Sequence, residues 1–267
     1  MLEKSIFLQF AIQAAKEAGE IQMKYFGNIS SLEKKSNNID LLTNADTESE
    51  KHIVSKIKSS FPNHSIITEE NKNITKDSEY TWIIDPLDGT TNFTHNLPIF
   101  AVSIALKKND KIICGVVYNP AADKCFYAEY KRGAYLNNEK IVPSKSKFLS
   151  DSLLATGFPY NHDEKYNLSF ILFKDFYDRT RGIRRLGAAA LDLCFVAMGR
   201  FDGFYEYNLN SWDICAGSLI AYEAGCKVTD WNNNKLPHDG SRILCSNDRI
   251  HNEMIKVLTK KEYNLFF

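Results

Sequence analysis

The chain has 267 residues, of which 44% are hydrophobic, and its 33 basic side chains balance 33 acidic ones. This length suffices for one large domain or two smaller ones with hydrophobic cores, and the composition excludes a disordered or fibrous chain. A formal net charge of zero argues against a broad nucleic-acid-binding surface. No apolar run approaches the roughly 20 residues that span a bilayer, so we expect a cytoplasmic protein without membrane contact.

The first part of the chain has helical periodicity and then changes to strands. Apolar residues recur at helical spacing from Leu2 to Tyr25, and a second amphipathic helix is predicted from Ala45 to Ser59. Residues 34–38 between them form a predicted polar loop. Apolar runs bounded by turn residues then predict strands at 82–84, 100–106, 112–118 and 125–130, and a hairpin at 133–141.

The second part of the chain alternates between strand and helix patterns. Strands are predicted at 153–156, 203–207, 226–229 and 242–245, and helices at 167–177, 187–198, 212–224 and 247–259. Gly225 stands where helix C-termini favour glycine. We therefore divide the chain into residues 1–142, with helices on a mostly antiparallel sheet, and residues 143–267, of α/β type.

The cysteines and histidines do not form a metal-binding pattern. The sequence has 6 of each but no C-x-x-C pair and no H-E-x-x-H motif. We interpret the cysteines as buried free thiols, and we exclude histidine-centred metal chemistry.

The most informative segment follows the strand predicted at 82–84. It contains two carboxylates, Asp85 and Asp88, with Pro86 between them. One interpretation is that Asp-Pro and Asp-Gly are turn dipeptides. The other is a ligand site, because side chains at the C-terminal end of a strand face the crevice in which α/β proteins bind ligands. The step Gly89-Thr90 would then open a helix whose free N–H groups receive a phosphate.

Further carboxylates are expected to converge on the same place. Oxygen ligands without histidine suit Mg²⁺, which favours carboxylates together with substrate phosphate. Glu69 and Glu70 follow an apolar run, and Asp213 and Asp46 stand at predicted helix starts. For these two aspartates, helix capping is the alternative role.

Two long motifs occur in order along the chain. Residues 85–93 read Asp-Pro-Leu-Asp-Gly-Thr-Thr-Asn-Phe, and residues 212–217 read Trp-Asp-Ile-Cys-Ala-Gly, continuing to Glu-Ala-Gly at 223–225. They resemble the two signatures of the inositol monophosphatase family of Mg²⁺-dependent, lithium-sensitive phosphatases. Residues 184–192 resemble its bacterial branch. Its N-terminal pattern is matched by Lys35, Asp40, Thr43, Asp46, Glu69 and Glu70.

The resemblance covers essentially the whole chain and implies a fold and an activity. The fold would be the layered α-β-α-β-α sugar-phosphatase architecture, with the active site between the two halves, in a homodimer. The activity would be hydrolysis of myo-inositol monophosphates by in-line attack of a metal-activated water, without a phospho-enzyme. Two or three Mg²⁺ ions would be bound per site.

The resemblance also implies a role for individual residues. The metal ligands would be Glu69, Asp85, the Leu87 carbonyl, Asp88 and Asp213. Asp46 and Thr90, with Glu69, would serve catalysis by orienting and deprotonating the attacking water. The substrate would meet Asp88, Gly89, Thr90, Ala189, Glu206 and Asp213. Glu70 and Lys35 would support the site. The departures from the family pattern, Ala188 and Cys215, are small.

Three alternatives stay open at this point. Related families use the same metal core on fructose 1,6-bisphosphate, histidinol phosphate, NADP(H) or 3′-phosphoadenosine 5′-phosphate. An aspartyl-nucleophile phosphatase of the haloacid dehalogenase class is disfavoured, because the carboxylates are spaced D-x-x-D around a proline. A regulatory scaffold would use Arg181, Arg184 and Arg185 for a nucleic acid or an acidic protein, although these residues also suit a dimer surface.

Overall fold

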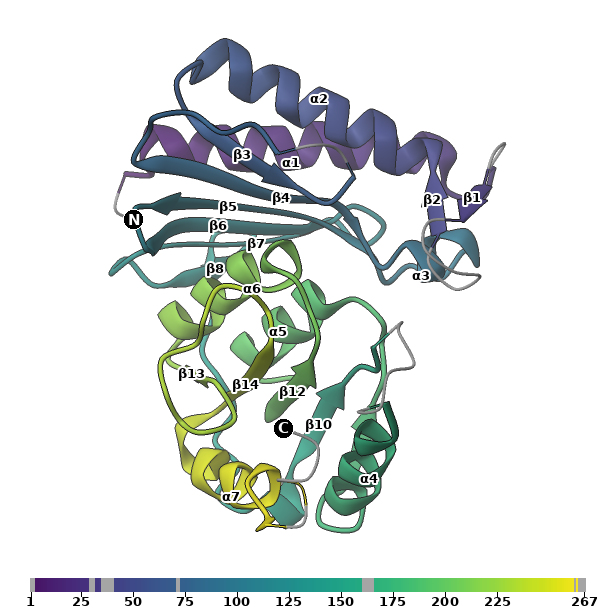
Figure 1. Cartoon of the computed structure of the whole chain (residues 1–267), viewed down its shortest axis with the longest axis vertical. Helices are drawn as coiled ribbons and strands as arrows, with labels where there is room; N and C mark the ends of the chain where they lie inside the picture. The colour runs from purple at the N-terminus through teal and green to yellow at the C-terminus, as the bar shows by residue number, and fades with distance from the viewer. Residues whose placement is uncertain are drawn as a thin grey trace.

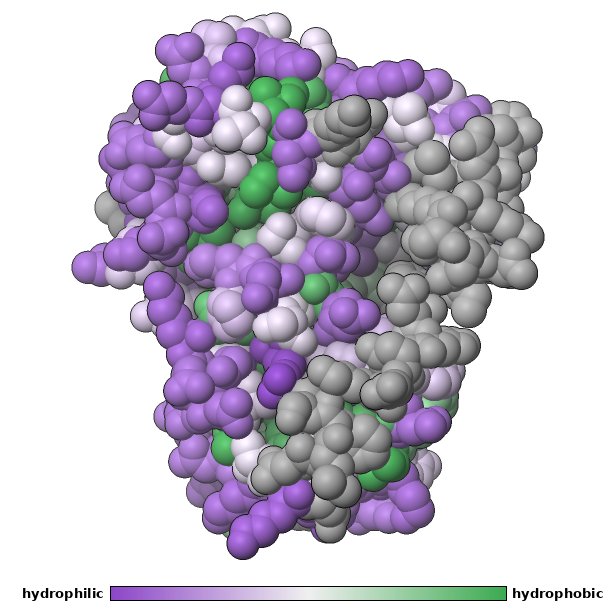
Figure 2. All heavy atoms as spheres, viewed as in Figure 1, coloured by the Kyte–Doolittle hydropathy of each residue, from purple (hydrophilic) through white to green (hydrophobic). Residues whose placement is uncertain are grey.

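The structure is a computed structural model that describes residues 3–28, 32–34, 41–70, 73–159, 166–261 and 263. Its helices and sheets alternate in the order helix, sheet, helix, sheet, helix (Figure 1). This is the α-β-α-β-α order that the resemblance implied. Among the residues coloured by hydropathy in Figure 2, hydrophilic ones predominate, with smaller apolar patches between them.

The first sheet has seven strands, and its spatial order follows the chain from β3 to β9. The strand β3 runs parallel to β4, and every later neighbour is antiparallel. Asn137 and Asn138, with φ of 46° and 73°, form the turn of the predicted hairpin. The strands are β3 (Ser65–Thr68), β4 (Tyr80–Asp88), β5 (Ala101–Lys108), β6 (Lys111–Asn119), β7 (Lys124–Glu129), β8 (Ala134–Leu136) and β9 (Glu139–Lys140).

Two long helices, α1 (Ile6–Tyr25) and α2 (Asn44–Ser60), cover the outer face of this sheet (Figure 1). The helix α1 begins later than predicted because the Ser5 hydroxyl caps it, accepting a hydrogen bond from the Leu8 N–H at 3.2 Å. A short antiparallel pair, β1 (Leu32–Lys34) and β2 (Leu41–Thr43), precedes α2 and was not predicted. The rest of the predicted polar loop, 35–38, lies outside the described residues.

The second sheet has five strands in the order β11-β10-β12-β14-β13. The first three are parallel to each other, and the last two are antiparallel to their neighbours. The strand β11 was not predicted, because three residues ending in an exposed arginine give no apolar run. The strands are β10 (Leu153–Thr156), β11 (Gly182–Arg184), β12 (Gly203–Tyr207), β13 (Lys227–Thr229) and β14 (Arg242–Ser246). The helices α4 (Tyr166–Tyr177) and α7 (Asp248–Leu258) cover its outer face.

The middle layer consists of α5 (Ala189–Ala197) and α6 (Ser211–Ala224), packed between the sheets (Figure 1). A Cβ atom at Gly115 would lie 2.9 Å from the Ala216 carbonyl oxygen, so glycine in β6 allows α6 to approach closely. One hydrophobic cluster contains residues of both sheets, such as Phe126 and Phe204. The division at residue 142 stays a prediction, since both halves contribute to this core.

Two further observations concern the chain as a whole. All six cysteines carry free and buried thiols, as predicted. None of the helices in the described ranges combines the length and hydrophobicity that a membrane span requires.

Candidate active site

A β-bulge places the two aspartates of β4 on one face of the sheet. Asp85 pairs with Ser103 and Asp88 with Ala101, so three steps along β4 oppose two along β5. Residues three apart in a regular strand point to opposite faces, and one extra residue restores the same face. The strand was predicted to end at residue 84; it continues through Asp88, and its irregularity aligns both carboxylates.

The turn after β4 is held by hydrogen bonds and a glycine. The Leu87 N–H donates to Asp85 Oδ1 at 3.0 Å, and Gln22 Nε2 donates to the Pro86 carbonyl at 2.6 Å. Gly89 has φ of +90°, and a Cβ there would lie 2.9 Å from the Ile99 carbonyl oxygen. The helix α3 (Thr90–Thr94) begins directly after it, at the step where the sequence predicted a helix to open.

Thr90 connects this turn to α2. Its Oγ1 lies 3.1 Å from Asp46 Oδ1 and 3.0 Å from the Leu87 carbonyl oxygen, and its single proton serves one of them at a time. Asp46 is fully buried, and its Oδ2 accepts a hydrogen bond from the Thr43 N–H at 2.8 Å. Asp46 therefore caps α2, as the alternative role proposed, and also contacts Thr90.

Helix starts also fix the other two aspartates. The Ala190 N–H, in the first turn of α5, donates to Asp88 Oδ2 at 2.9 Å. Asp213 lies in the first turn of α6, and its Oδ2 accepts a hydrogen bond from the Asn210 N–H at 2.6 Å. Both carboxylates are thus anchored by backbone groups, which limits their rotation.

Glu69 and Glu70 follow β3, as the sequence indicated, and a buried glutamate of α2 holds this segment. Glu50 Oε2 accepts hydrogen bonds from the Thr68 hydroxyl at 2.5 Å and the Glu70 N–H at 3.0 Å. Glu50 was not predicted as a site residue, because in the sequence it is one of several polar residues of an amphipathic helix. Its hydrogen bonds hold the two residues that flank Glu69 in the chain.

A cavity between the two sheets collects several of the predicted residues. Those that line it are Glu69, Asp88, Ala189, Glu206 and Asp213. Asp85 is not part of the lining, but it is buried behind it and interacts electrostatically with Glu69, Asp88 and Asp213. The remaining predicted residues, which do not line the cavity, are Asp46, Glu70, Leu87, Gly89 and Thr90. Lys35 lies outside the described residues.

The cavity has a strongly acidic wall. Burial raises the pKa of Asp85 well above its usual range, and the nearby Glu69, Asp88 and Asp213 carboxylates raise it further. Burial also raises the pKa of Asp88, with Asp213 as its strongest charged neighbour, although N–H groups of Ala190 and Ala189 oppose the shift. Like charges buried together cost free energy unless a cation or protons neutralise them.

Glu206, on β12, lines the same cavity. Burial raises its pKa to about 8, although the Arg185 guanidinium opposes the shift. A Cβ atom at Gly157 would lie 2.2 Å from Glu206 Oε1, so the absence of a side chain there leaves the room that this carboxylate occupies.

Comparisons with known proteins agree with this architecture. The model of the inositol monophosphatase family matches residues 3–263. The chain belongs to the inositol monophosphatase family. It is 35% identical to an inositol-1-monophosphatase of Rhizobium meliloti over 97% of this chain and 98% of the relative. It is 43% identical to a protein named Nus factor SuhB of Vibrio cholerae, over 91% of each.

A solved structure supports the same assignment. The extragenic suppressor protein suhB of Bartonella henselae is 38% identical and superposes with a TM-score of 0.91, covering 96% of this chain and 100% of the other. The layered fold of the inositol monophosphatase family is therefore the fold of this chain.

The donor set of the cavity fits the metal ions that this family implies. Carboxylates are the ligands that Mg²⁺ prefers, and they lie buried together here. Among the described residues, no three His, Cys, Asp or Glu side chains form a ready-made metal site. In proteins, Mg²⁺ is usually held by one or two carboxylates and keeps water and substrate phosphate as its other ligands.

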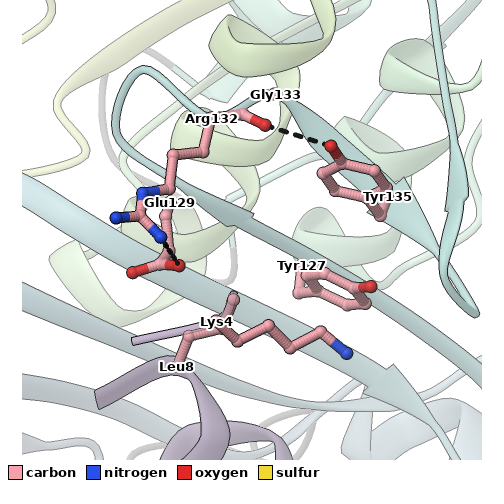
Figure 3. A pocket seen from close by; sticks show the side chains of 7 residues that line it. All are labelled: Lys4, Leu8, Tyr127, Glu129, Arg132, Gly133 and Tyr135. Atoms are coloured by element: carbon pink, nitrogen blue, oxygen red, sulfur yellow. Dashed lines mark hydrogen bonds and ion pairs between the residues drawn. The ribbon is translucent and has the colours of Figure 1, made fainter. Parts of the chain in front are cut away.

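A second hollow, at the start of α1, has a different character (Figure 3). Its charged groups have partners: Arg132 lies 3.5 Å from Glu129 Oε2, and Lys4 Nζ lies 4.6 Å from the centre of the Tyr127 ring. The Tyr135 hydroxyl donates to the Arg132 carbonyl at 3.2 Å. We assign no chemistry to this hollow.

Proposed function

We propose that the chain is a Mg²⁺-dependent phosphomonoesterase that hydrolyses myo-inositol monophosphates by in-line attack of a metal-activated water. One observation carries the proposal: Glu69, Asp88 and Asp213, from three separate segments, line one cavity together with Glu206. The cluster of carboxylates suits a metal-bound phosphate, and Glu206, near the Arg185 guanidinium, suits a hydroxyl-bearing leaving group.

The electrostatic interactions among the carboxylates suggest which of them would hold each metal ion. Glu69 and Asp85, with the Leu87 carbonyl, would hold one ion, and Asp88 and Asp213 would hold a second; two or three ions in total follow from the family. When bound, Mg²⁺ supplies charge neutralisation of the phosphoryl oxygens, a lower pKa of bound water and stabilisation of the leaving oxygen.

The chain itself positions the water and the phosphate. The Thr90 hydroxyl accepts the proton of the attacking water while it passes its own proton to Asp46 Oδ1, 3.1 Å away. The Gly89 and Thr90 N–H groups would bind a phosphoryl oxygen. The water oxygen forms the new bond to phosphorus as the ester bond on the opposite side breaks. The alkoxide that leaves takes a proton from solvent.

The test is phosphate release from a panel of esters with and without Mg²⁺. The panel contains inositol 1-phosphate, fructose 1,6-bisphosphate, histidinol phosphate and 3′-phosphoadenosine 5′-phosphate. We expect Mg²⁺-dependent turnover, with inositol 1-phosphate preferred and loss of turnover in Asp85→Asn. A preference for another ester would move the chain to that branch of the superfamily. An aspartyl phosphate trapped on Asp85 would contradict water attack.

The names of several relatives support a second candidate function. The Vibrio cholerae relative is named Nus factor SuhB, which is not an enzyme name. A regulatory function of this chain would use the exposed Arg184 and Arg185, next to Arg181, whose Nη2 lies 3.1 Å from Asp151 Oδ1. The test is RNA binding at rising salt, with the Arg184→Ala/Arg185→Ala double variant as comparison. This function would be favoured if the protein showed no turnover and bound RNA with an affinity that falls steeply as the salt concentration rises.

We also propose that the chain forms a homodimer, as the family implies. Sedimentation equilibrium over a range of concentrations gives the mass directly. A mass near twice the 30.5 kDa of the chain is expected, and a monomer at all concentrations would contradict the proposal.

A further inference from the structure

An apolar cavity lies along the C-terminal half of α6, and the proposed mechanism does not use it. Its volume is about 300 Å³, the lower end of the range for sites that bind small organic molecules. Its walls come from the turn between β5 and β6, the residue after β7, α6, β13 and the segment that carries Lys235 and His238. It shares no lining residue with the active-site cavity, and we call it the α6 cavity.

Apolar and aromatic side chains dominate the lining of the α6 cavity. Ile112, Leu219 and Leu236 are buried side chains of this lining. Two aromatic residues, Tyr130 and Tyr222, complete it, and Tyr222 is 59% exposed. Such a surface favours a ligand with an aromatic face, because the ligand removes apolar area from water and packs against the tyrosine rings.

Positive charge accompanies this apolar surface. Lys111 and Lys235 line the cavity, and neither has an ion-pair partner among the residues that the structure describes. Lys111 Nζ lies 4.5 Å from the centre of the Tyr130 ring, and Lys131 Nζ lies 5.5 Å from it. Asp110 is the acidic residue of the lining, so the lysines exceed the carboxylates. The charge of the cavity therefore suits an anion.

His238 leaves this charge unchanged near neutral pH and helps to fix the wall. Burial lowers the pKa of its imidazole, and the nearby Lys235 and Lys107 lower it further. A hydrogen bond with the Asp110 backbone opposes the shift and joins the segment of His238 to the turn between β5 and β6. A β-bridge between Thr229 and Lys235 fixes the start of the same segment. The α6 cavity is therefore largely formed before a ligand binds.

The two cavities on either half of α6 favour opposite partners. The active-site cavity presents Glu69, Asp88 and Asp213, so an anion binds there only together with cations. The α6 cavity presents lysines beside apolar side chains, so an anion with an apolar body binds there without a metal ion. Dependence on metal ions thus distinguishes binding at one cavity from binding at the other.

We propose that the α6 cavity binds a small aromatic anion, in which a planar ring system carries an acidic group. The ring system would pack against Leu219 and Tyr222, and the acidic group would pair with Lys111 and Lys235. An inositol phosphate offers no apolar face to this lining, and a neutral aromatic compound leaves the lysines without a counter-charge. The site is additional to the proposed phosphatase function and does not depend on it.

The experiment uses two dyes whose fluorescence rises when they leave water. Anilinonaphthalene sulfonate is an aromatic anion, and N-phenylnaphthylamine is its neutral analogue without the sulfonate. The full chain is titrated with each dye in EDTA, and we expect saturable binding of the anionic dye at one site per chain. In Lys111→Met/Lys235→Met the Kd of the anionic dye should rise about 5-fold, and that of the neutral dye should stay within about 2-fold. In Tyr222→Ala both Kd values should rise about 3-fold or more.

Matched variants outside the α6 cavity serve as controls. They are Lys145→Met/Lys147→Met and Tyr177→Ala, since Tyr177 is 57% exposed and resembles Tyr222 in this respect. All four variants change exposed side chains, so an unchanged Tm shows that they fold, and the two controls should bind both dyes as the unmodified chain does.

Three results would overturn the inference. The first is an equal rise of Kd in the controls, which would place the dye elsewhere on the surface. The second is an equal effect of the lysine double variant on both dyes, or none on either. The third is displacement of the anionic dye by inositol 1-phosphate with Mg²⁺, which would place the dye in the active-site cavity. Retention of the dye under that condition supports a separate site.

Discussion

The two hollows described above both contain charged side chains, and they differ in how those charges are paired. In the hollow at the start of α1, the Arg132 guanidinium meets Glu129, and Lys4 lies over an aromatic ring (Figure 3). At the cavity between the sheets, Asp88 in its lining and the buried Asp85 interact with other carboxylates. The charges of the first hollow are paired within the chain, whereas those of the cavity have to be neutralised by a bound cation or by protons, which is typical of functional sites.

The largest expected effect comes from Asp85→Asn, with Glu129→Gln as its counterpart in the paired hollow. Loss of a carboxylate from the proposed metal site should reduce kcat/KM by about 10³-fold or more. The free energy of unfolding without metal should rise, because a repelled buried charge is removed. Glu129→Gln should leave kinetics unchanged and lower stability by about 1 kcal/mol. Phosphate release measures the change in kcat/KM, and urea unfolding measures the change in the free energy of unfolding. Equal changes in the two variants would contradict the difference between the two hollows.

Glu206→Gln tests the cavity through the pH dependence of stability. The folded pKa of Glu206, about 8, lies above its ordinary value of 4.5. Between these values the folded state holds a proton that the unfolded state releases, so stability falls as pH rises from about 5 to 8. Removing the group should flatten this slope, with a gain on the order of a few kcal/mol at pH 8. Urea unfolding in EDTA at a series of pH values measures this slope. An identical slope in Glu206→Gln and in the unmodified chain would contradict burial of Glu206 as its cause.

Gly157→Ala should disturb the same wall without changing a charge. Its Cβ would lie 2.2 Å from Glu206 Oε1, so the carboxylate has to move. We expect kcat/KM for inositol 1-phosphate to fall by about 10-fold, the equivalent of one hydrogen bond to a charged group. Turnover of p-nitrophenyl phosphate serves as the internal control, and an equal fall on both esters would show a general defect.

The smallest effect is expected for Lys4→Met in the paired hollow. An exposed contact between an ammonium and a ring contributes roughly 0.5–1 kcal/mol. The free energy of unfolding should therefore fall by about 0.5 kcal/mol, with kinetics unchanged. A loss of turnover in this variant would mean that the hollow takes part in function after all.

Periodicity and turn residues predicted most of the fold. The strands β10 and β12 have the predicted bounds, and α6 ends at Gly225, whose φ is +105°. The start of α5 was predicted two residues early, because Gly187 has φ of +80° and Ala188 is extended, which a helical apolar pattern does not reveal. The β1–β2 pair and β11 were missed, since three-residue strands carry too little pattern.

The candidate site was predicted unevenly, for physical reasons. Residues next to strand ends and turns, such as Asp88 and Glu69, can be recognised from their local sequence, and the fold then brings these residues together. The bulge in β4 has no such signal, because it depends on the pairing with β5. Glu50 was missed because it is one polar residue of an amphipathic helix, and only its burial and hydrogen bonds distinguish it.

The most direct test of the account is thermal melting of the chain during a Mg²⁺ titration, beside Asp85→Asn and Glu129→Gln. An ion that binds only the folded state stabilises it by about 2.7 kcal/mol at 100 times its Kd, which shifts Tm by several degrees. We predict this shift for the unmodified chain and Glu129→Gln, and its loss or strong reduction in Asp85→Asn. An equal Tm shift in all three proteins, or none in any, would contradict a cation site at the carboxylate wall.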